Sequence, residues 1–95
     1  IEFITIATLG NIQDFGDLTI FRACLRACSN QVRAVFGGGY FVPSTTASGG
    51  TDDNRIDYIT IATAGNAQDF GDLASGNVHA RGAALSDSHG GLGGF

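Results

Sequence analysis

The 95-residue chain contains no lysine, no tryptophan and no methionine, and it has one proline and two cysteines. All five cationic side chains are arginines, and nine acidic residues give a net charge of −4. This balance argues against nucleic acid or an anionic membrane surface as a partner, because both attract cationic proteins. The chain also lacks an apolar run of about eighteen residues and a recognisable signal peptide, so no membrane-spanning helix is expected.

The two cysteines, Cys24 and Cys28, lie four positions apart. In an extended strand both side chains would lie on one face about 13 Å apart, which is too far for a mutual disulfide. We therefore expect small buried thiols, with an intermolecular disulfide or a shared metal as the alternative. Because the chain begins with Ile1, we also expect a processed, excised or partial sequence, and no compartment is indicated.

A duplication accounts for most of the sequence. Residues 1–18, IEFITIATLGNIQDFGDL, return as residues 56–73, IDYITIATAGNAQDFGDL, with fourteen of eighteen positions identical at an offset of 55. The register continues, so residues 1–40 form copy one and residues 56–95 form copy two, while residues 41–55 occur once. The whole chain is thus expected to be one domain of two repeats, neither of which can bury its apolar face alone.

Strands are favoured over helices, because β-branched residues cluster and apolar side chains alternate with polar ones. Fifteen glycines also fit a chain with many tight turns. The composition of residues 41–55 predicts a loop, and Gly65-Asn66 is expected to supply the turn of a hairpin. The predicted antiparallel strands, which form a β-meander, are Thr19–Cys28, Val32–Gly38, Ile56–Ala62 and Gln68–Leu73.

The strand order also predicts how the chain closes. One four-stranded unit is complete, whereas the second is divided, with one hairpin at each end of the chain. Such a division is typical of a β-propeller whose terminal strands share a blade, so we predict two blades per chain, completed between copies. A homotrimer with six blades is favoured over a dimer or a tetramer, and a pair of stacked sheets is the alternative. Phe15 and Phe70 are expected to wedge between blades.

Several landmarks of the repeat resemble those of a kelch-type β-propeller blade. Arg26 and Arg81 stand where the first kelch strand carries an arginine, and residues 35–39, VFGGG, match the glycine doublet of the second strand. Tyr58 matches the tyrosine of the third strand. The kelch tryptophan before the fourth strand has no counterpart here, and the recurring phenylalanines would substitute for it. The resemblance implies an all-β propeller.

The repeat as a whole is similar to tandem repeats in structural and tail-fibre-like proteins of marine bacteriophages, especially those that infect cyanobacteria. Those repeats read much like IDYITIATxGNAxDFGDL, followed by an arginine-bearing strand and a VFGGG run. The two copies of 40 residues cover 80 of the 95 residues. This similarity implies a context of virion attachment, and it carries no catalytic residues.

Two groups of residues suggest an active site or a metal site. Residues 86–89, SDSH, place a hydroxyl, a carboxylate and an imidazole side by side, but a catalytic triad needs groups that converge from separate places. A polar turn is expected there instead. His79 and His89, together with the two cysteines, lack the spacing of a structural zinc site. We expect no catalytic residue, no metal and no cofactor.

The charged residues have structural or ligand-binding interpretations. The aspartates of QDFGDL predict solvated turn and edge positions, with Asp17 or Asp72 accepting backbone N–H bonds and a calcium site as the alternative. They are Asp14, Asp17, Asp69 and Asp72. The segment 51–54, TDDN, predicts an exposed loop, again with a cation site as the alternative. Arginines of the inner strand are expected to pair with carboxylates of a neighbouring blade or to line a central channel. They are Arg22, Arg26 and Arg81.

These observations favour a non-enzymatic structural or recognition protein that carries a ligand on loops at one end of an oligomeric ring or in its channel. A carbohydrate or another host-surface molecule is the expected ligand, by analogy alone. Two alternatives stay open. One is an enzyme whose site forms in the central channel of the assembled propeller, and the other is a minimal propeller fragment with no activity of its own.

Overall fold

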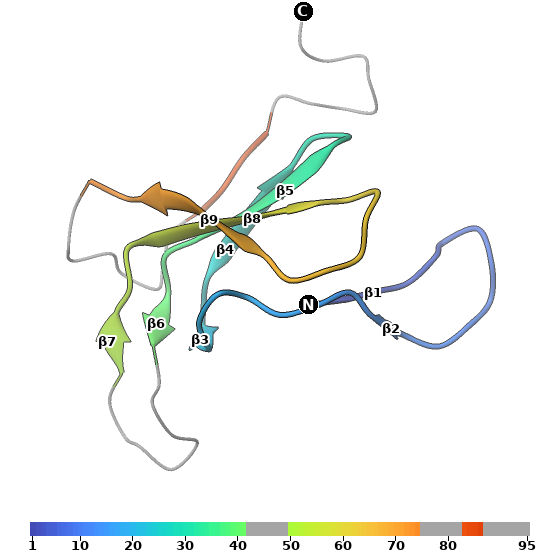
Figure 1. Ribbon diagram of the computed structural model, residues 1–95, viewed down its shortest axis with the longest axis horizontal. Helices are drawn as coiled ribbons and strands as arrows, with labels where there is room; N and C mark the ends of the chain where they lie inside the picture. The colour runs from blue at the N-terminus through green and yellow to red at the C-terminus, as the bar shows by residue number, and fades with distance from the viewer. Residues whose placement is uncertain (42–49, 75–82, 87–95) are drawn as a thin grey trace, which may run out of the picture.

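The computed structural model describes residues 1–41, 50–74 and 83–86. These residues form nine strands in three sheets (Figure 1). Every strand pairing is antiparallel, and no helix occurs in the described ranges. The predicted all-β class is therefore confirmed. In the same ranges, no helix is long and apolar enough to cross a membrane.

The largest sheet, called the main sheet, has four strands in the order in which they occur in the chain. Within it, Val35 pairs with Cys28 on one side and with Tyr58 on the other, and Tyr58 in turn pairs with Gln68. The predicted meander is thus confirmed. A β-bulge interrupts the last pairing between Ile56 and Asp57. The four strands are β4 (Arg26–Ser29), β5 (Arg33–Gly37), β8 (Arg55–Thr60) and β9 (Gln68–Asp72).

The predicted strand over residues 19–28 is wrong in one respect, because it is broken at Cys24. This residue has φ of 58°, a left-handed conformation that side chains other than glycine rarely adopt. The break separates β3 (Arg22–Ala23) from β4. The expectation of buried cysteines is also wrong, since Cys24 is exposed, Cys28 is half-buried and both are free thiols.

The predicted loop over residues 41–55 is wrong at both ends, because each end contributes a short strand. β6 (Tyr40–Phe41) pairs with β3 and with β7 (Thr51–Asp52), which makes a three-stranded sheet. Gly39 makes this crossing possible, since its φ is 102° and a Cβ there would lie 2.5 Å from the Ala23 carbonyl oxygen. The backbones of two segments of one chain thus pass close to each other at this glycine.

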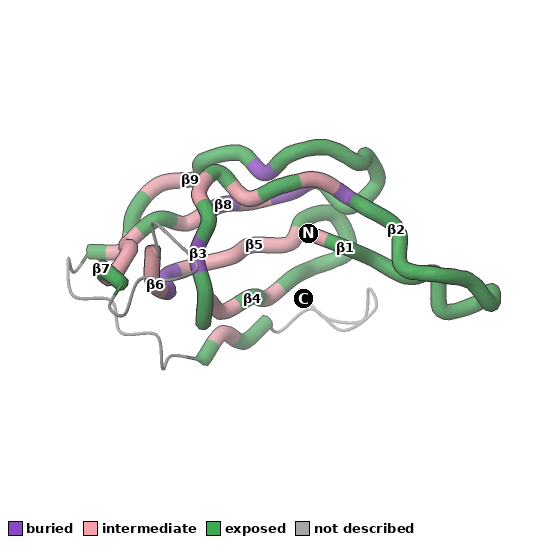
Figure 2. Tube along the Cα trace, turned by 90° about the horizontal axis from the view of Figure 1, so that it is seen from below, coloured by how far each residue is buried: buried purple, intermediate pink, exposed green. Residues whose placement is uncertain are grey.

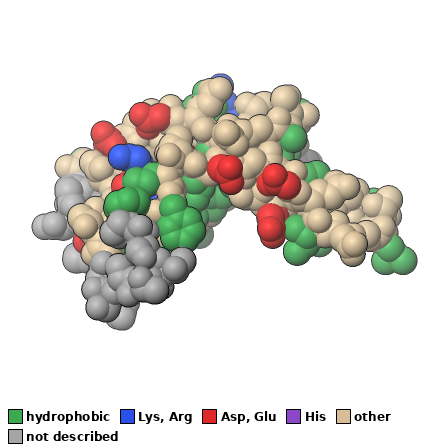
Figure 3. Space-filling model, turned by 60° about the horizontal axis from the view of Figure 1, so that its bottom comes forward, with side chains coloured by type: hydrophobic (Ala, Val, Ile, Leu, Met, Phe, Trp, Pro, Cys, Tyr) green, Lys and Arg blue, Asp and Glu red, His purple; other side chains and the backbone are tan. Residues whose placement is uncertain are grey.

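The third sheet is a hairpin of β1 (Glu2–Phe3) and β2 (Gln13–Asp14), called here the N-terminal hairpin. Its loop projects from the rest of the molecule (Figures 1 and 2). Figure 3 shows hydrophobic side chains at the exposed end of this projection. The strands expected in the second half of copy two, beyond residue 74, fall largely outside the described residues.

The two copies contact each other directly after the N-terminal hairpin. Residues 15–17, called the docking segment, lie against residues 65–67 of the β8–β9 connection, called the receiving loop. The Gly65 N–H donates to the Phe15 carbonyl at 2.8 Å, and the Ala67 N–H donates to the Asp17 carbonyl at 2.8 Å. The Asp17 N–H donates to the Asn66 side-chain oxygen at 2.9 Å. The copies are thus joined by hydrogen bonds as well as by the chain.

The apolar core lies at this contact. Phe15 of the docking segment packs with Ile59 of β8 and Ala67 of the receiving loop, and all three are buried. In Figure 2 the buried positions are few and most of the surface is exposed. Phe70, which corresponds to Phe15 at the offset of 55, is exposed in the single chain. Of the two recurring phenylalanines, only Phe15 is therefore buried within a chain.

Candidate functional site

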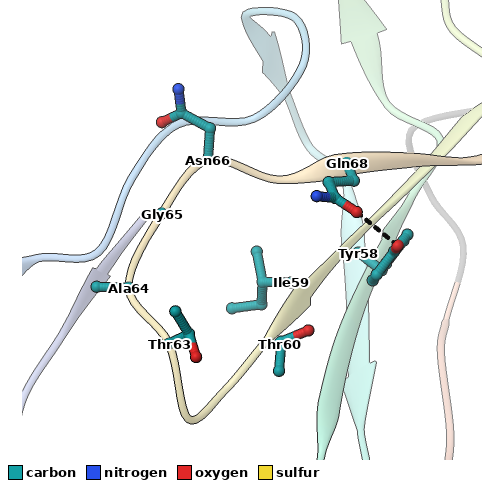
Figure 4. A pocket seen from close by; sticks show the side chains of 8 residues that line it. All are labelled: Tyr58, Ile59, Thr60, Thr63, Ala64, Gly65, Asn66 and Gln68. Atoms are coloured by element: carbon teal, nitrogen blue, oxygen red, sulfur yellow. Dashed lines mark hydrogen bonds between the residues drawn. The ribbon is translucent and has the colours of Figure 1, made fainter.

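A hollow of about 430 Å³ lies inside the connection between β8 and β9 (Figure 4). The chain leaves the main sheet at Thr60 and returns to it at Gln68, and four of the seven residues between them line the hollow. The Thr63 N–H donates to the Thr60 carbonyl at 3.2 Å and the Ile61 N–H donates to the Val32 carbonyl at 2.9 Å. These two bonds fix the start of the connection. The lining residues are Tyr58, Ile59, Thr60, Thr63, Ala64, Gly65, Asn66 and Gln68.

The chemistry of this hollow is neutral and polar, because none of its lining residues carries a charge. Thr63 and Ile59 point into the space that the connection encloses, and Thr60, the next residue of β8, lines its border from the other side of the strand (Figure 4). The Tyr58 hydroxyl donates to the side-chain oxygen of Gln68 at 2.6 Å. This bond orients the Gln68 amide and leaves its NH₂ group available to donate to a ligand. Hydroxyl and amide groups next to one aromatic ring can therefore bind an uncharged polar molecule.

A second, smaller hollow of about 110 Å³ occurs at the equivalent place in the N-terminal hairpin. Its turn closes in the same way, since the Thr8 N–H donates to the Thr5 carbonyl at 3.3 Å. Each of its lining residues has a counterpart in the first hollow at the offset of 55. They are Thr5, Thr8, Leu9, Gly10, Asn11 and Gln13. The hollow is thus a property of the repeat and not of one loop.

The aromatic residue beside the hollow is held in the same geometry in both copies. Phe3 and Phe15 meet edge to face with ring centroids 5.9 Å apart and an interplanar angle of 86°. Tyr58 and Phe70 meet at 6.0 Å and 84°. The sequence identity of the copies therefore extends to side-chain packing, with one added hydroxyl in copy two. The guanidinium of Arg33 also lies 5.0 Å from the centroid of the Tyr58 ring.

Sequence reasoning did not single out this hollow. The signal was present, because ITIATxGNxQ contains two threonines, an asparagine and a glutamine that recur at identical positions in both copies. A repeated polar segment inside a hairpin connection is a candidate binding loop. From composition alone, Gly65-Asn66 is expected to form a tight turn, whereas seven residues connect β8 to β9 in the structure.

In the structure, aspartate side chains of the two QDFGDL segments accept hydrogen bonds from the backbone. The side chain of Asp14 accepts the Gly16 N–H at 3.1 Å, and that of Asp69 accepts the Gly71 N–H at 3.0 Å. The first aspartate of each pair has this role, whereas the sequence analysis assigned it to Asp17 or Asp72. Among the described residues no three His, Cys, Asp or Glu side chains form a group able to hold a metal ion. The calcium alternative gains no support from this geometry.

The arginine of β3 forms the most buried polar cluster of the described structure. The Arg22 guanidinium donates to Asp57 at 2.8 Å, to the Arg55 carbonyl at 2.7 Å and to the Phe36 carbonyl at 3.3 Å. It also lies 3.4 Å from Asp53. Arg22 thus pairs with carboxylates of its own chain, where the sequence analysis expected a neighbouring blade or a channel.

Asp53 shows that segment 51–54 is part of the fold. Its side-chain oxygen accepts the Arg55 N–H at 2.9 Å, and its own N–H donates to the Gly39 carbonyl at 2.9 Å. The expectation of an exposed loop is therefore wrong for this segment. Arg26 donates to the carbonyls of Cys24 and Leu25 at 3.2 and 3.1 Å. These two hydrogen bonds stabilise the irregular backbone between β3 and β4.

The remaining residues considered from the sequence do not come together in the described part of the chain. Ser86 is exposed, whereas residues 87–89, His79 and Arg81 lie outside the described residues. Cys24 and Cys28 belong to no metal-binding group within the described ranges. Comparison of the chain with protein-family models, with curated proteins and with solved structures found no match.

Proposed function

We propose that this chain is a non-enzymatic recognition and structural protein that binds a neutral carbohydrate in the hollows of its repeat. The observation that carries the proposal is the recurrence of one neutral polar hollow at equivalent positions of both copies. A repeated site of modest size suits a ligand that is itself repetitive, such as a glycan. Two weak sites in one chain also gain avidity when the ligand presents several identical units.

The residue types support this ligand class. Sugars present hydroxyl groups that donate and accept hydrogen bonds, and the hydroxyls of Thr60 and Thr63 and the Gln68 amide offer both functions. Sugars also present C–H faces that pack on aromatic rings, and Tyr58 provides such a ring. A few well-placed polar groups beside an apolar surface are the usual composition of a small-molecule site.

We propose further that each chain supplies two blades of a β-propeller that is closed by other copies. The main sheet supports this, because four antiparallel strands in sequential order are the arrangement of a propeller blade. The N-terminal hairpin supports it as well. β8 carries β5 on one side and β9 on the other, whereas its equivalent β1 carries only β2 within the described residues. A strand of another copy would complete the sheet at β1, and six blades in a trimer is the favoured ring.

The resemblance of the repeat to cyanophage structural repeats supports a role in virion attachment, which is a setting in which glycan recognition is useful. The alternative of a catalytic channel rests on no specific contact in the described residues. We therefore put forward a single function, recognition.

A glycan array tests the ligand class directly. We expect binding to at least one family of neutral glycans, and we expect Gln68→Ala and Thr60→Val each to weaken it about tenfold, by loss of one hydrogen bond to the ligand. Thr51→Val, at an exposed threonine of β7, is the matched control and should bind as wild type. Silence across a broad array, or equal binding by all four proteins, would exclude this ligand class and this site.

A further inference from the structure

Apolar side chains that are buried in one copy are exposed at the equivalent position of the other. Ile59 is 8 % exposed and Ala67 is 8 % exposed, whereas their counterparts Ile4 and Ile12 are 58 % and 62 % exposed. The relationship is reversed for the phenylalanine of QDFGDL, which is buried in copy one and exposed in copy two. Equivalent positions of the two copies therefore lie in different environments, one in the apolar core and one exposed to solvent.

Phe15 is 9 % exposed and its counterpart Phe70 is 61 % exposed. The cause of the difference is the contact between the copies, in which the docking segment 15–17 covers the receiving loop 65–67. In copy two the receiving loop is covered, whereas residues 70–72, the equivalent of the docking segment, are not. In copy one the docking segment is covered by its contact, whereas residues 10–12, the equivalent of the receiving loop, are not.

The two open surfaces match each other in detail, because they repeat the residues of the occupied pair. Phe70-Gly71-Asp72 repeats Phe15-Gly16-Asp17, and Gly10-Asn11-Ile12 repeats Gly65-Asn66-Ala67 with isoleucine in place of alanine. The central glycine of the two docking sequences also has the same backbone angle, since φ is 146° at Gly16 and 143° at Gly71. The open segment therefore already has the conformation that the occupied one uses.

We propose that residues 70–72 of one chain dock on residues 10–12 of a second copy of the same chain. In this contact the Phe70 and Asp72 carbonyls accept the N–H groups of Gly10 and Ile12, and the Asn11 side chain accepts the Asp72 N–H. The Phe70 ring packs against Ile4 and Ile12 and rebuilds the core that Phe15 forms within a chain. The repeat therefore identifies a second copy of the chain as the partner that covers these exposed apolar side chains.

One chain cannot make this contact with itself. β9 and the projecting loop of the N-terminal hairpin lie on opposite sides of the molecule (Figure 1), whose longest extent is 40 Å. The contact is therefore head-to-tail, with different surfaces on the two partners, and repetition of one rotation closes it into a ring. β9 is also the outer strand of the main sheet, and docking protects an edge that would otherwise promote aggregation.

This inference rests on the assembly proposed above and goes beyond it, because it names the contact between successive blades and not only the completion of a blade. Gly10 and Asn11 of this contact also line the second hollow, but the glycan test uses Thr60 and Gln68, which take no part in the contact. The two proposals can therefore fail separately.

The test is the mass of the wild-type protein and two variants across a range of concentrations, by native mass spectrometry and sedimentation equilibrium. Phe70→Ser removes the ring, and Asn11→Ala removes the acceptor. We expect each variant to raise the dissociation constant of the assembly at least tenfold, with unchanged circular dichroism. Val32→Ser is the matched control, because Val32 is equally exposed, at 59 %, and its counterpart in the other copy is the polar residue Asp87. It should assemble as wild type.

Hydrogen exchange on the wild-type protein tests the same contact without any substitution. We expect the amides of Gly10 and Ile12 to exchange slowly in the assembled state and quickly on dilution to monomer, whereas those of Gly65 and Ala67, which are hydrogen-bonded within the chain, should exchange slowly in both. A wild-type protein that stays monomeric overturns both the assembly and this contact. An assembly that is insensitive to Phe70→Ser and Asn11→Ala, with fast exchange at Gly10 and Ile12, overturns this contact alone.

Discussion

The Arg22 guanidinium and the Asp57 carboxylate lie 2.8 Å apart, and both side chains are completely buried. Arg22 belongs to copy one and Asp57 to copy two, so the ion pair joins segments 35 residues apart in the chain. Asp57 also accepts two bonds from Thr19, at 2.7 Å from the hydroxyl and at 3.3 Å from the N–H. These bonds connect residues 19–22, which follow the docking segment, to β8 of the main sheet.

Removal of one partner of this pair should be costly. In Arg22→Ala the buried Asp57 carboxylate loses its counter-charge, and we expect the free energy of unfolding to fall by about 3–5 kcal/mol. Urea unfolding followed by circular dichroism measures the change. Arg55→Ala is the control, because its guanidinium is 44 % exposed and lies 3.8 Å from Asp53, and such a pair contributes about 0–1 kcal/mol. Equal losses in the two variants would contradict a special role for the buried pair.

A glycine where the chain crosses itself should tolerate no side chain. Gly39→Ala places a methyl group 2.5 Å from the Ala23 carbonyl oxygen at φ of 102°, so we expect a loss of about 2–4 kcal/mol from strain and overlap. Gly37→Ala, two residues away, meets only an Ile56 side-chain carbon at 4.0 Å and should change stability by less than about 0.5 kcal/mol. The comparison uses the same unfolding measurement, and a neutral Gly39→Ala would argue against the β3–β6 crossing.

In a dilute monomer, the two phenylalanines of QDFGDL should contribute differently to the free energy of unfolding. Phe15→Ala leaves a cavity in the small core, and we expect a loss of about 3–5 kcal/mol. Phe70→Ala removes an exposed ring from the same sequence context and should cost less than about 1.5 kcal/mol, the range of an edge-to-face pair. At concentrations at which the wild type assembles, the cost of Phe70→Ala should rise, because assembly stabilises the folded state by mass action. A concentration-independent cost would conflict with docking of this ring between copies.

The hydroxyl of Tyr58 orients the Gln68 amide in the hollow, so its removal should lower ligand affinity more than it lowers the stability of the fold. Tyr58→Phe removes the 2.6 Å bond to Gln68 and makes copy two equal to copy one at this position, where Phe3 stands. We expect a loss of about 0.5–1 kcal/mol in stability, since the bond is exposed. Glycan affinity should fall further, because the Gln68 amide loses its fixed orientation. Tyr58→Leu, which also removes the ring contact with Phe70, should be less stable than Tyr58→Phe by about 0.5–1.5 kcal/mol.

Much of the local structure could be predicted because it follows from short-range pattern. Alternation and turn residues predicted the strands at residues 32–38 and 68–73 and their sequential antiparallel order, and β5 and β9 lie within those ranges. The pattern failed at Cys24, where the strand breaks although the alternation continues. The reason is tertiary, because the chain passes there from the sheet in which β3 pairs with β6 into the main sheet.

The candidate site was predictable in part. The repeat itself contained the threonines and amides of the hollow, but a hairpin connection that encloses space cannot be told from a tight turn by composition alone. The sequence predicted that Arg22 could pair with a carboxylate but did not identify Asp57 as its partner, since the pair does not recur at the equivalent positions of the other copy, where Asn77 and Glu2 stand.

The all-β class, the two copies and the order of the strands in the main sheet follow from the amino-acid sequence alone, because spacing and alternation along the chain are enough to specify them. Which copy of each repeated surface is covered depends on the three-dimensional arrangement of the chain. Phe15 and Phe70 have the same neighbours in sequence, yet burial depends on which loop lies opposite, and that is a property of how distant segments meet in space.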